Sequence, residues 1–267
     1  MAQGFGPKVT SFAADSEPPV RGYLHYASVP ADASQPPTTD RLPASDLRQA
    51  MVLSHGAGSN CQAPLLVAVA TAFAAAGFTV LRCDLPYRQK RPHGPPLGSA
   101  AEDQRGLRNA VVAVRELGPD RPFGRVYLGG HSYGGRQGAM LAADDASLVD
   151  GLLLLSYPLH PPKKPEQLRT AHFPRLRTPA MFVHGSRDPF GSIEEMESAL
   201  KLIPAATILL PVEGAGHDLS FKPLRPSRPL GPSEPSGPLE EGRRHIAVDD
   251  LPEKVVAAFC QWSASLS

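Results

Sequence analysis

The chain has few cysteines and lacks long hydrophobic runs. Its three cysteines, Cys61, Cys83 and Cys260, lie far apart, show no Cys-x-x-Cys or other metal-ligand spacing, and cannot all pair within one chain. A reducing cytosol is therefore the expected setting. No segment reaches the ~18 consecutive apolar residues of a membrane span, and residues 1–6 lack the basic start and apolar core of a signal peptide. We therefore expect a cytoplasmic protein with no membrane partner.

An excess of either charge is also absent. Lysine and arginine number 27 and aspartate and glutamate 26, so the net charge of +1 gives no reason to expect nucleic acid as a partner. The length of 267 residues and the hydrophobic content of 42% suit one domain over residues 1–267. The 30 prolines cluster in segments expected to be loops. One of these, the Pro- and Gly-rich stretch at about 222–243, is expected to be a mobile surface excursion.

Apolar runs alternate with segments of helical pattern along most of the chain. This alternation predicts an α/β fold with a mostly parallel sheet and helices on both faces. Strands are expected at 20–29, 51–54, 78–86, 125–128, 151–156, 179–183 and 207–212. Helices are expected at 63–76, 100–117, about 134–144, 193–203 and 249–263. No long insertion separates the strands at 151–156 and 179–183, so no large cap domain is expected.

The stretch around Ser132 carries the most informative motif. The strand-like run at 125–128 leads into Gly129-Gly130-His131-Ser132-Tyr133-Gly134-Gly135, and a helix-like segment follows. In this Gly-x-Ser-x-Gly arrangement a strained turn, with room left by its glycines, exposes a serine hydroxyl as a nucleophile. The amide of Tyr133, at the start of the helix, is then placed to stabilise an oxyanion. Alone, the motif also fits an ordinary glycine-rich turn.

A second glycine-rich turn follows the strand at 51–54. Its sequence is His55-Gly56-Ala57-Gly58. In hydrolases with a Gly-x-Ser-x-Gly turn, a loop at this place supplies the other oxyanion amide. Ala57 is the first candidate for that oxyanion-hole donor and Gly58 the second. The alternative is a turn that only closes a strand–helix unit.

Two later strands run into a candidate acid and a candidate base. Asp188 follows the strand at 179–183, and His217 lies in a glycine-flanked loop after the strand at 207–212. Asp188 could instead cap the helix at 193–203, but Ser192 suits that role at least as well. The chain order Ser132, Asp188, His217 is the nucleophile–acid–base order of α/β-hydrolases. These three are therefore the predicted catalytic residues.

Candidate substrate-binding residues lie in or beside these motifs. They are His55, Arg88, His131, Tyr157 and His160. Arg88 and Arg91 belong to a basic loop at 87–96 that leaves the carboxyl end of a strand, where open α/β sheets bind ligands. This loop predicts a site for an anionic or polar substrate group, and a solvated loop is the favoured alternative. For His160, a pocket or structural role is favoured over that of the base.

Together the motifs resemble those of α/β-hydrolases of the dienelactone-hydrolase-like superfamily. The run Ser156-Tyr157-Pro158-Leu159-His160-Pro161-Pro162 more narrowly resembles a branch of bacterial predicted hydrolases. That branch is related to the testis-expressed and NSL-complex-subunit hydrolase-fold proteins of animals. The resemblance covers about residues 50–220 and the last helix. Because true dienelactone hydrolases use cysteine where this chain has Ser132, their lactone substrate does not carry over.

The resemblance and the motifs imply a serine hydrolase that needs no metal or organic cofactor. Its expected partner is a small-molecule ester, thioester or lactone; a carboxylic ester ranks first and a peptide last, because peptidases usually need a larger gating domain. The alternative from another class is a non-catalytic hydrolase-fold scaffold or complex subunit, as animal members of the branch suggest. A nucleotide-binding dehydrogenase is excluded because no Gly-x-Gly-x-x-Gly follows the first strand.

Overall fold

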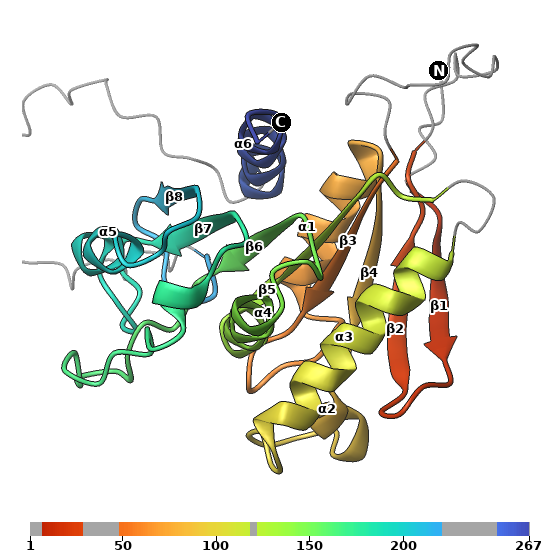
Figure 1. Ribbon diagram of the computed structural model, residues 1–267, viewed down its shortest axis with the longest axis horizontal. Helices are drawn as coiled ribbons and strands as arrows, with labels where there is room; N and C mark the ends of the chain where they lie inside the picture. Colours follow the sequence, from red (N-terminus) through yellow and green to blue (C-terminus); the bar gives the residue numbers. More distant parts are fainter. Residues whose placement is uncertain (1–6, 29–47, 118–121, 221–249, 267) are drawn as a thin grey trace, which may run out of the picture.

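One mixed sheet organises the chain (Figure 1). The computed structural model describes residues 7–28, 48–117, 122–220 and 250–266, so the stretch at about 222–243 lies outside the described residues. The strands are β1 (Val9–Ala14), β2 (Val20–His25), β3 (Gln49–Ser54), β4 (Phe78–Cys83), β5 (Arg125–His131), β6 (Gly151–Leu155), β7 (Ala180–Gly185) and β8 (Thr207–Val212). The helices are α1 (Pro64–Ala75), α2 (Pro86–Lys90), α3 (Ala100–Glu116), α4 (Tyr133–Asp144), α5 (Ile193–Leu200) and α6 (Leu251–Ala264), with a short 3-10 helix, η2 (Phe173–Arg175).

The strand order across the sheet is β1-β2-β4-β3-β5-β6-β7-β8. The strands from β4 to β8 are parallel, and β1 and β2 join them as an antiparallel edge. Ser54 at the end of β3 pairs with Gly130 of β5, and Gly185 at the end of β7 pairs with Val212 of β8. Parallel strands end at one edge of a sheet, so the loops that follow β3, β5, β7 and β8 meet there.

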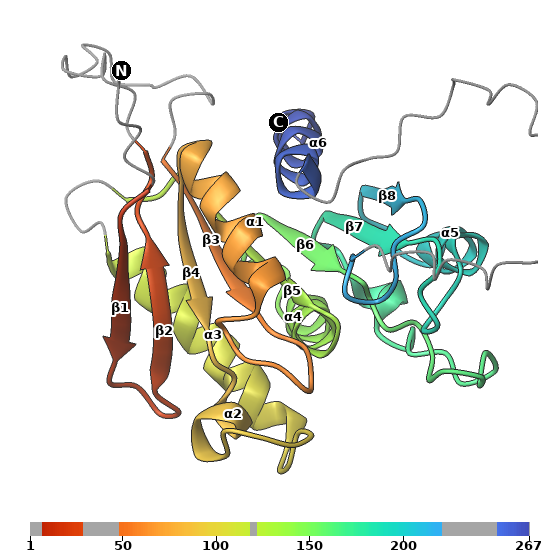
Figure 2. The same cartoon turned by 180° about the vertical axis from the view of Figure 1, so that it is seen from behind.

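Helices cover both faces of the sheet, as the sequence predicts (Figures 1 and 2). Successive residues of one strand pack into different cores, because side chains alternate between the two faces. Val52 belongs to the core beneath α3, α4 and α5, whereas its neighbour Met51 belongs to the core beneath α1 and α6. Phe73 of α1 and Phe259 of α6 pack edge to face in this second core, with ring centroids 5.3 Å apart. The prediction of a mostly parallel α/β sheet is confirmed.

Two elements differ in kind from the sequence prediction. The edge strand β1 was not predicted. It pairs with β2 on one side, and its side chains alternate between exposed and half-buried. The segment 87–96 was predicted as a loop, but it begins within the short helix α2. Pro86 occupies the first turn of this helix, a position that proline favours because its fixed backbone angle suits a helix start.

The connections across the carboxyl edge of the sheet are short. Residues 156–179, between β6 and β7, are described throughout and contain η2 as their helical element, so the expectation of no large cap at this place is met. None of the helices in the described part of the chain is long and apolar enough to cross a membrane.

Candidate active site

Ser132 lies in the turn that joins β5 to α4. Its φ angle of 51° is in the left-handed region, which side chains other than glycine rarely adopt. A hydrogen bond of 2.8 Å from its amide to the carbonyl oxygen of Leu155 on β6 holds this backbone in place. Non-glycine residues in this region cost about 1–3 kcal/mol and often mark functional sites.

The glycines on either side of Ser132 permit this tight turn because the end of β3 and the residue after it lie against them. A Cβ atom on Gly130 would lie 2.6 Å from the Ser54 side-chain oxygen. A Cβ atom on Gly134 would lie 2.6 Å from the carbonyl oxygen of His55. Both separations are too short for real atoms, so the glycines bring Ser132 and the loop after β3 together.

A chain of hydrogen bonds links Ser132 to the loops after β7 and β8. The Ser132 Oγ–H donates to His217 Nε2 over 2.8 Å, and His217 Nδ1–H donates to Asp188 Oδ2 over 2.8 Å. The Asp188 side chain is 0% exposed, whereas that of His217 is 23% exposed. The ring of Phe190 lies against the His217 imidazole, with centroids 4.1 Å apart. A buried carboxylate, an orientated imidazole and a serine hydroxyl are the groups that acyl transfer requires.

The helix cap predicted at Ser192 accounts for why Asp188 is available. The Ser192 side chain accepts from the amide of Glu195, and the Glu195 side chain accepts from the amide of Ser192, which forms a capping box at the start of α5. Asp188 takes no part in this cap. Its Oδ1 accepts the amide of Phe190 over 2.9 Å and also lies 3.0 Å from His217 Nδ1, so the backbone fixes the carboxylate that faces His217.

In the described part of the chain, three residues that line the cavity beside Ser132 have unpaired backbone amides. Ala57, Gly58 and Tyr133 all line this cavity, and within the described residues none of their amides has a hydrogen-bond partner. Tyr133 is the first residue of α4, where the helix dipole adds positive potential. Free amides at this place suit an oxyanion that forms at the Ser132 hydroxyl.

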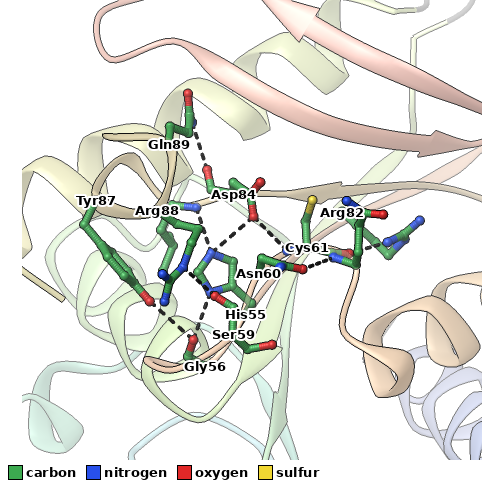
Figure 3. Close-up of polar contacts among 12 residues, drawn as sticks. His55, Gly56, Ser59, Asn60, Cys61, Arg82, Asp84, Tyr87, Arg88 and Gln89 are labelled. Carbon is green, nitrogen blue, oxygen red and sulfur yellow. Dashed lines mark hydrogen bonds and ion pairs between the residues drawn. The ribbon is translucent and has the colours of Figure 1, made fainter. Parts of the chain in front are cut away.

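Side chains from α2 hold the loop between Gly56 and Ser59 (Figure 3). The Ala57 carbonyl oxygen accepts from the Tyr87 hydroxyl over 2.8 Å and from Arg88 Nη2 over 3.0 Å. Arg88 Nε also donates to the Ser59 carbonyl oxygen over 2.7 Å. Because the carbonyl and the following amide share one plane, holding the Ala57 carbonyl sets the direction of the Gly58 N–H.

The structure corrects the substrate-binding prediction for Arg88 and His55. Neither lines the cavity beside Ser132, and both are buried against backbone groups (Figure 3). His55 Nδ1–H donates to the Gly56 carbonyl oxygen over 2.9 Å, while His55 Nε2 accepts from the Leu85 amide over 3.1 Å. This pattern requires a neutral ring, and burial lowers the pKa of His55 accordingly. Arg91, the other arginine of the predicted anion site, lies exposed after α2.

The prediction for Tyr157 and His160 is corrected in the same way. Both are buried and neither lines the cavity beside Ser132. The Tyr157 hydroxyl donates to the Arg169 carbonyl oxygen over 2.7 Å, and His160 Nε2 lies 3.4 Å from a carboxylate oxygen of Glu195. Tyr157 therefore supports a segment of the cavity wall, and His160 has the structural role that the sequence left open.

The cavity beside Ser132 has a volume of about 580 Å³. Ser132 and His217 line it. So do the predicted oxyanion residues Ala57 and Tyr133 and the predicted substrate-binding residue His131. It also contains two arginines, Arg136 and Arg169, that the sequence analysis did not select. For Arg136 a signal existed, because it lies four positions after Ser132 at the start of α4.

A second cavity, of about 860 Å³, is larger but lacks the reactive groups. It runs along α1 to the start of α6 and contains neither Ser132 nor His217. The smaller cavity is therefore the candidate active site. Within the described residues, no group of three or more His, Cys, Asp or Glu side chains has the arrangement of a metal site.

Residues 47–228, more than half of the chain, match the family described as alpha/beta hydrolase domain. The chain belongs to this α/β-hydrolase family. Solved structures with the same fold include dienelactone hydrolase from Anabaena variabilis, with 17% identity, a TM-score of 0.65 and coverage of 96% of this chain and 99% of that one. Est1E from Butyrivibrio proteoclasticus has 14% identity, a TM-score of 0.61 and coverage of 96% and 99%. A serine hydrolase without a lid from Xanthomonas campestris has 15% identity, a TM-score of 0.58 and coverage of 97% and 96%.

The predicted membership of the α/β-hydrolases is thus confirmed, and the likeness to dienelactone hydrolase is one of fold. The narrower resemblance, to the branch related to the animal proteins, stays a prediction.

Proposed function

We propose that this α/β-hydrolase cleaves a carboxylic ester of a small molecule through an acyl-enzyme. Ser132 is the proposed nucleophile, His217 the general base and Asp188 the acid that orientates the base. The observation that carries this proposal is the continuous hydrogen-bond chain from Ser132 Oγ through His217 to Asp188. Thioesters and lactones present a similar carbonyl and are the next candidate substrates.

The proposed reaction has two halves. In the first, His217 Nε2 takes the hydroxyl proton as Ser132 Oγ bonds to the ester carbon; it then gives this proton to the leaving alkoxide as the old C–O bond breaks. In the second, His217 activates a water that attacks the acyl-enzyme, and the carboxylic acid leaves while Ser132 regains its proton. Asp188 accepts from Nδ1–H throughout, which keeps Nε2 available to Ser132 and stabilises the imidazolium.

The amides of Ala57 and Tyr133 are the proposed oxyanion donors, with Gly58 as the alternative to Ala57. In this proposal they bind the negative oxygen of each tetrahedral intermediate, where a single donor of this kind contributes about 2.7–4 kcal/mol. The Ala57 N–H shares a peptide plane with the Gly56 carbonyl, which accepts from His55 Nδ1–H over 2.9 Å and from the Tyr87 hydroxyl over 3.3 Å. These contacts support Ala57, because a donor must be fixed before charge develops, and the anchoring of the Ala57 carbonyl supports Gly58 in the same way.

The neighbouring structures support a small acyl substrate. Est1E has been solved with ferulic acid bound, and the Xanthomonas protein is described as a serine hydrolase without a lid. The short connection between β6 and β7 in this chain fits the same open architecture.

The first test is labelling with a fluorophosphonate probe, which reacts with activated serines, beside turnover of a 4-nitrophenyl ester series of rising acyl length. Wild type should be labelled and active, and Ser132→Ala should lose both. Absence of labelling in a folded wild-type protein would overturn the hydrolase proposal in favour of a non-catalytic scaffold.

A further inference from the structure

The cavity beside Ser132 has an unusual balance of charge. Arg136 and Arg169 line it, and no aspartate or glutamate among the described residues does. The buried Asp188 carboxylate lies behind His217, which already binds it. The fixed charges that face this space are therefore positive.

Arg136 lies one helical turn after the candidate nucleophile. Its amide donates to the Ser132 carbonyl oxygen over 2.9 Å, which ties its backbone to the turn. Its Nε atom is buried and has no hydrogen-bond partner within the described residues. Among the same residues, its guanidinium forms no ion pair with a carboxylate. A buried donor without a partner costs about 1–3 kcal/mol. The guanidinium also lies within hydrogen-bond reach of the Tyr157 hydroxyl, a neutral group that does not balance its positive charge.

Arg169 approaches from the segment between β6 and β7, where its backbone is fixed at both ends. Its amide donates to the Leu159 carbonyl oxygen over 2.7 Å, and its own carbonyl accepts from the Tyr157 hydroxyl over 2.7 Å. The nearest acceptor of its guanidinium is the Pro158 carbonyl oxygen, at a long 3.4 Å. Burial and the positive charge of Arg136 both lower the pKa of Arg169. The two guanidinium groups therefore lie close enough to repel one another.

Three arginines outside the cavity have carboxylate partners. Arg21, Arg108 and Arg175 each have a carboxylate within 3.1 Å. Arg136 and Arg169 are instead held beside a serine in a cavity without an acidic lining residue. Guanidinium groups bind carboxylates through paired N–H donors, so two of them in one cavity match a carboxylate ligand.

We propose that Arg136 and Arg169 form an anion subsite and that the substrate is an ester that also carries a free carboxylate. This inference rests on the proposed hydrolase function for the identity of the reacting group. The anionic recognition that was one interpretation of Arg88 and Arg91 thereby moves to two residues that line the cavity beside Ser132. The carboxylate binds the guanidinium pair and holds the ester carbonyl against Ser132.

The test compares matched pairs of esters by titration of the released acid. Monoethyl glutarate against ethyl pentanoate places the carboxylate on the acyl side, and 3-acetoxybenzoate against phenyl acetate places it on the alcohol side. Wild type should prefer the charged ester of one pair by about tenfold or more in kcat/KM, since a hydrogen bond to a charged group contributes this much. Arg136→Gln and Arg169→Gln should each remove most of that preference, taken as the ratio of kcat/KM for the charged and the neutral ester in the same variant.

Arg175→Gln is the matched control. It also removes one positive charge, but Arg175 is exposed and paired with Asp144 outside the cavity, so the preference should persist. A wild type without preference for either charged ester, or a preference that survives both cavity substitutions, would overturn the anion subsite.

A binding measurement separates this inference from the hydrolase proposal. Calorimetric titration of Ser132→Ala with monoethyl glutarate and 3-acetoxybenzoate requires no turnover. At least one should bind, and the further substitution Arg136→Gln should weaken its binding about tenfold or more. Such binding together with an inactive wild type would leave the subsite standing and remove the hydrolase function. Equal binding by the single and double variants would overturn the subsite.

Discussion

His131 Nε2–H donates to the backbone carbonyl oxygen of His217 over 2.8 Å. The residue before the candidate nucleophile therefore holds the loop that carries the candidate base. The two imidazole rings lie 5.2 Å apart, and burial lowers the pKa of His131, which favours its neutral form. This contact gives His131 a positioning role beside the substrate-binding role predicted from the sequence.

His131→Phe tests which role dominates. Phenylalanine keeps a ring against His217 but cannot donate to its carbonyl, so we expect kcat to fall about tenfold, as loss of one positioning hydrogen bond would produce, with KM little changed. The fluorophosphonate labelling rate should fall in parallel. His131→Gln, whose amide can donate, should recover part of the loss. A rise in KM with unchanged kcat would show instead that His131 binds substrate.

Asp188→Asn tests the proposed acid. The asparagine oxygen can still accept from the Phe190 amide, but its NH₂ then faces His217 Nδ1. His217 would accept there and carry its proton on Nε2, the wrong tautomer to deprotonate Ser132. We expect kcat to fall by about 10³–10⁴ with little change in thermal stability. Glu213→Gln, which alters an exposed acid near His217 in sequence, should leave kcat within about threefold of wild type.

Arg88→Met tests the anchoring of the loop that contains Ala57. Methionine keeps the apolar stem but leaves the carbonyls of Ala57 and Ser59 without the guanidinium. We expect unfolding to become easier by about 1–3 kcal/mol and kcat to fall about tenfold for charged and neutral esters alike. Chemical denaturation and steady-state kinetics measure the two effects.

The same experiment distinguishes the structural role of Arg88 from the substrate-binding role first predicted for it. A rise in KM confined to acidic esters would restore the earlier prediction. Arg91→Met is the control, because Arg91 is exposed and its substitution should change neither stability nor rate by more than about twofold.

Local patterns explain what the sequence could predict. Ser132, Asp188 and His217 each follow a separate strand, and parallel strands bring their carboxyl ends to one edge whatever lies between them. The order of strands and helices was therefore enough to predict both the fold and which three side chains would meet. The Ser192 cap was also local, since its partner Glu195 is three residues away.

Contacts between distant segments explain the residues whose roles were predicted wrongly. Arg88 and the backbone oxygens that it binds in the loop after β3 are about 30 positions apart. No spacing in the sequence indicates that this basic side chain is buried. Tyr157 likewise points to a backbone carbonyl at Arg169. Arg136 and Arg169 were missed because the cavity joins α4 to the segment between β6 and β7.

His25 predicts how stability depends on pH. It lies on β2 and is 1% exposed, and its Nε2 accepts a hydrogen bond of 2.8 Å from Arg82 Nε. Burial and the charge of Arg82 lower the pKa of His25 from 6.5 to about 4. Between pH 6.5 and about 4 the unfolded chain therefore binds a proton here that the folded chain does not. Protonation of His25 in the unfolded chain therefore does not lower the unfolding free energy above pH 6.5, and lowers it increasingly as the pH falls through this window.

His25→Gln should reduce this dependence. The unfolding free energy is measured by urea denaturation at several pH values. Between pH 6.5 and 4, its slope against pH should be smaller than that of wild type by up to about 1.4 kcal/mol per pH unit, because one titrating site is removed. Part of the slope should persist, since burial also lowers the pKa of His55, His172 and His184. His93→Gln, at an exposed position, is the control and should keep the wild-type slope. An unchanged slope in His25→Gln would mean that protonation of His25 does not accompany unfolding.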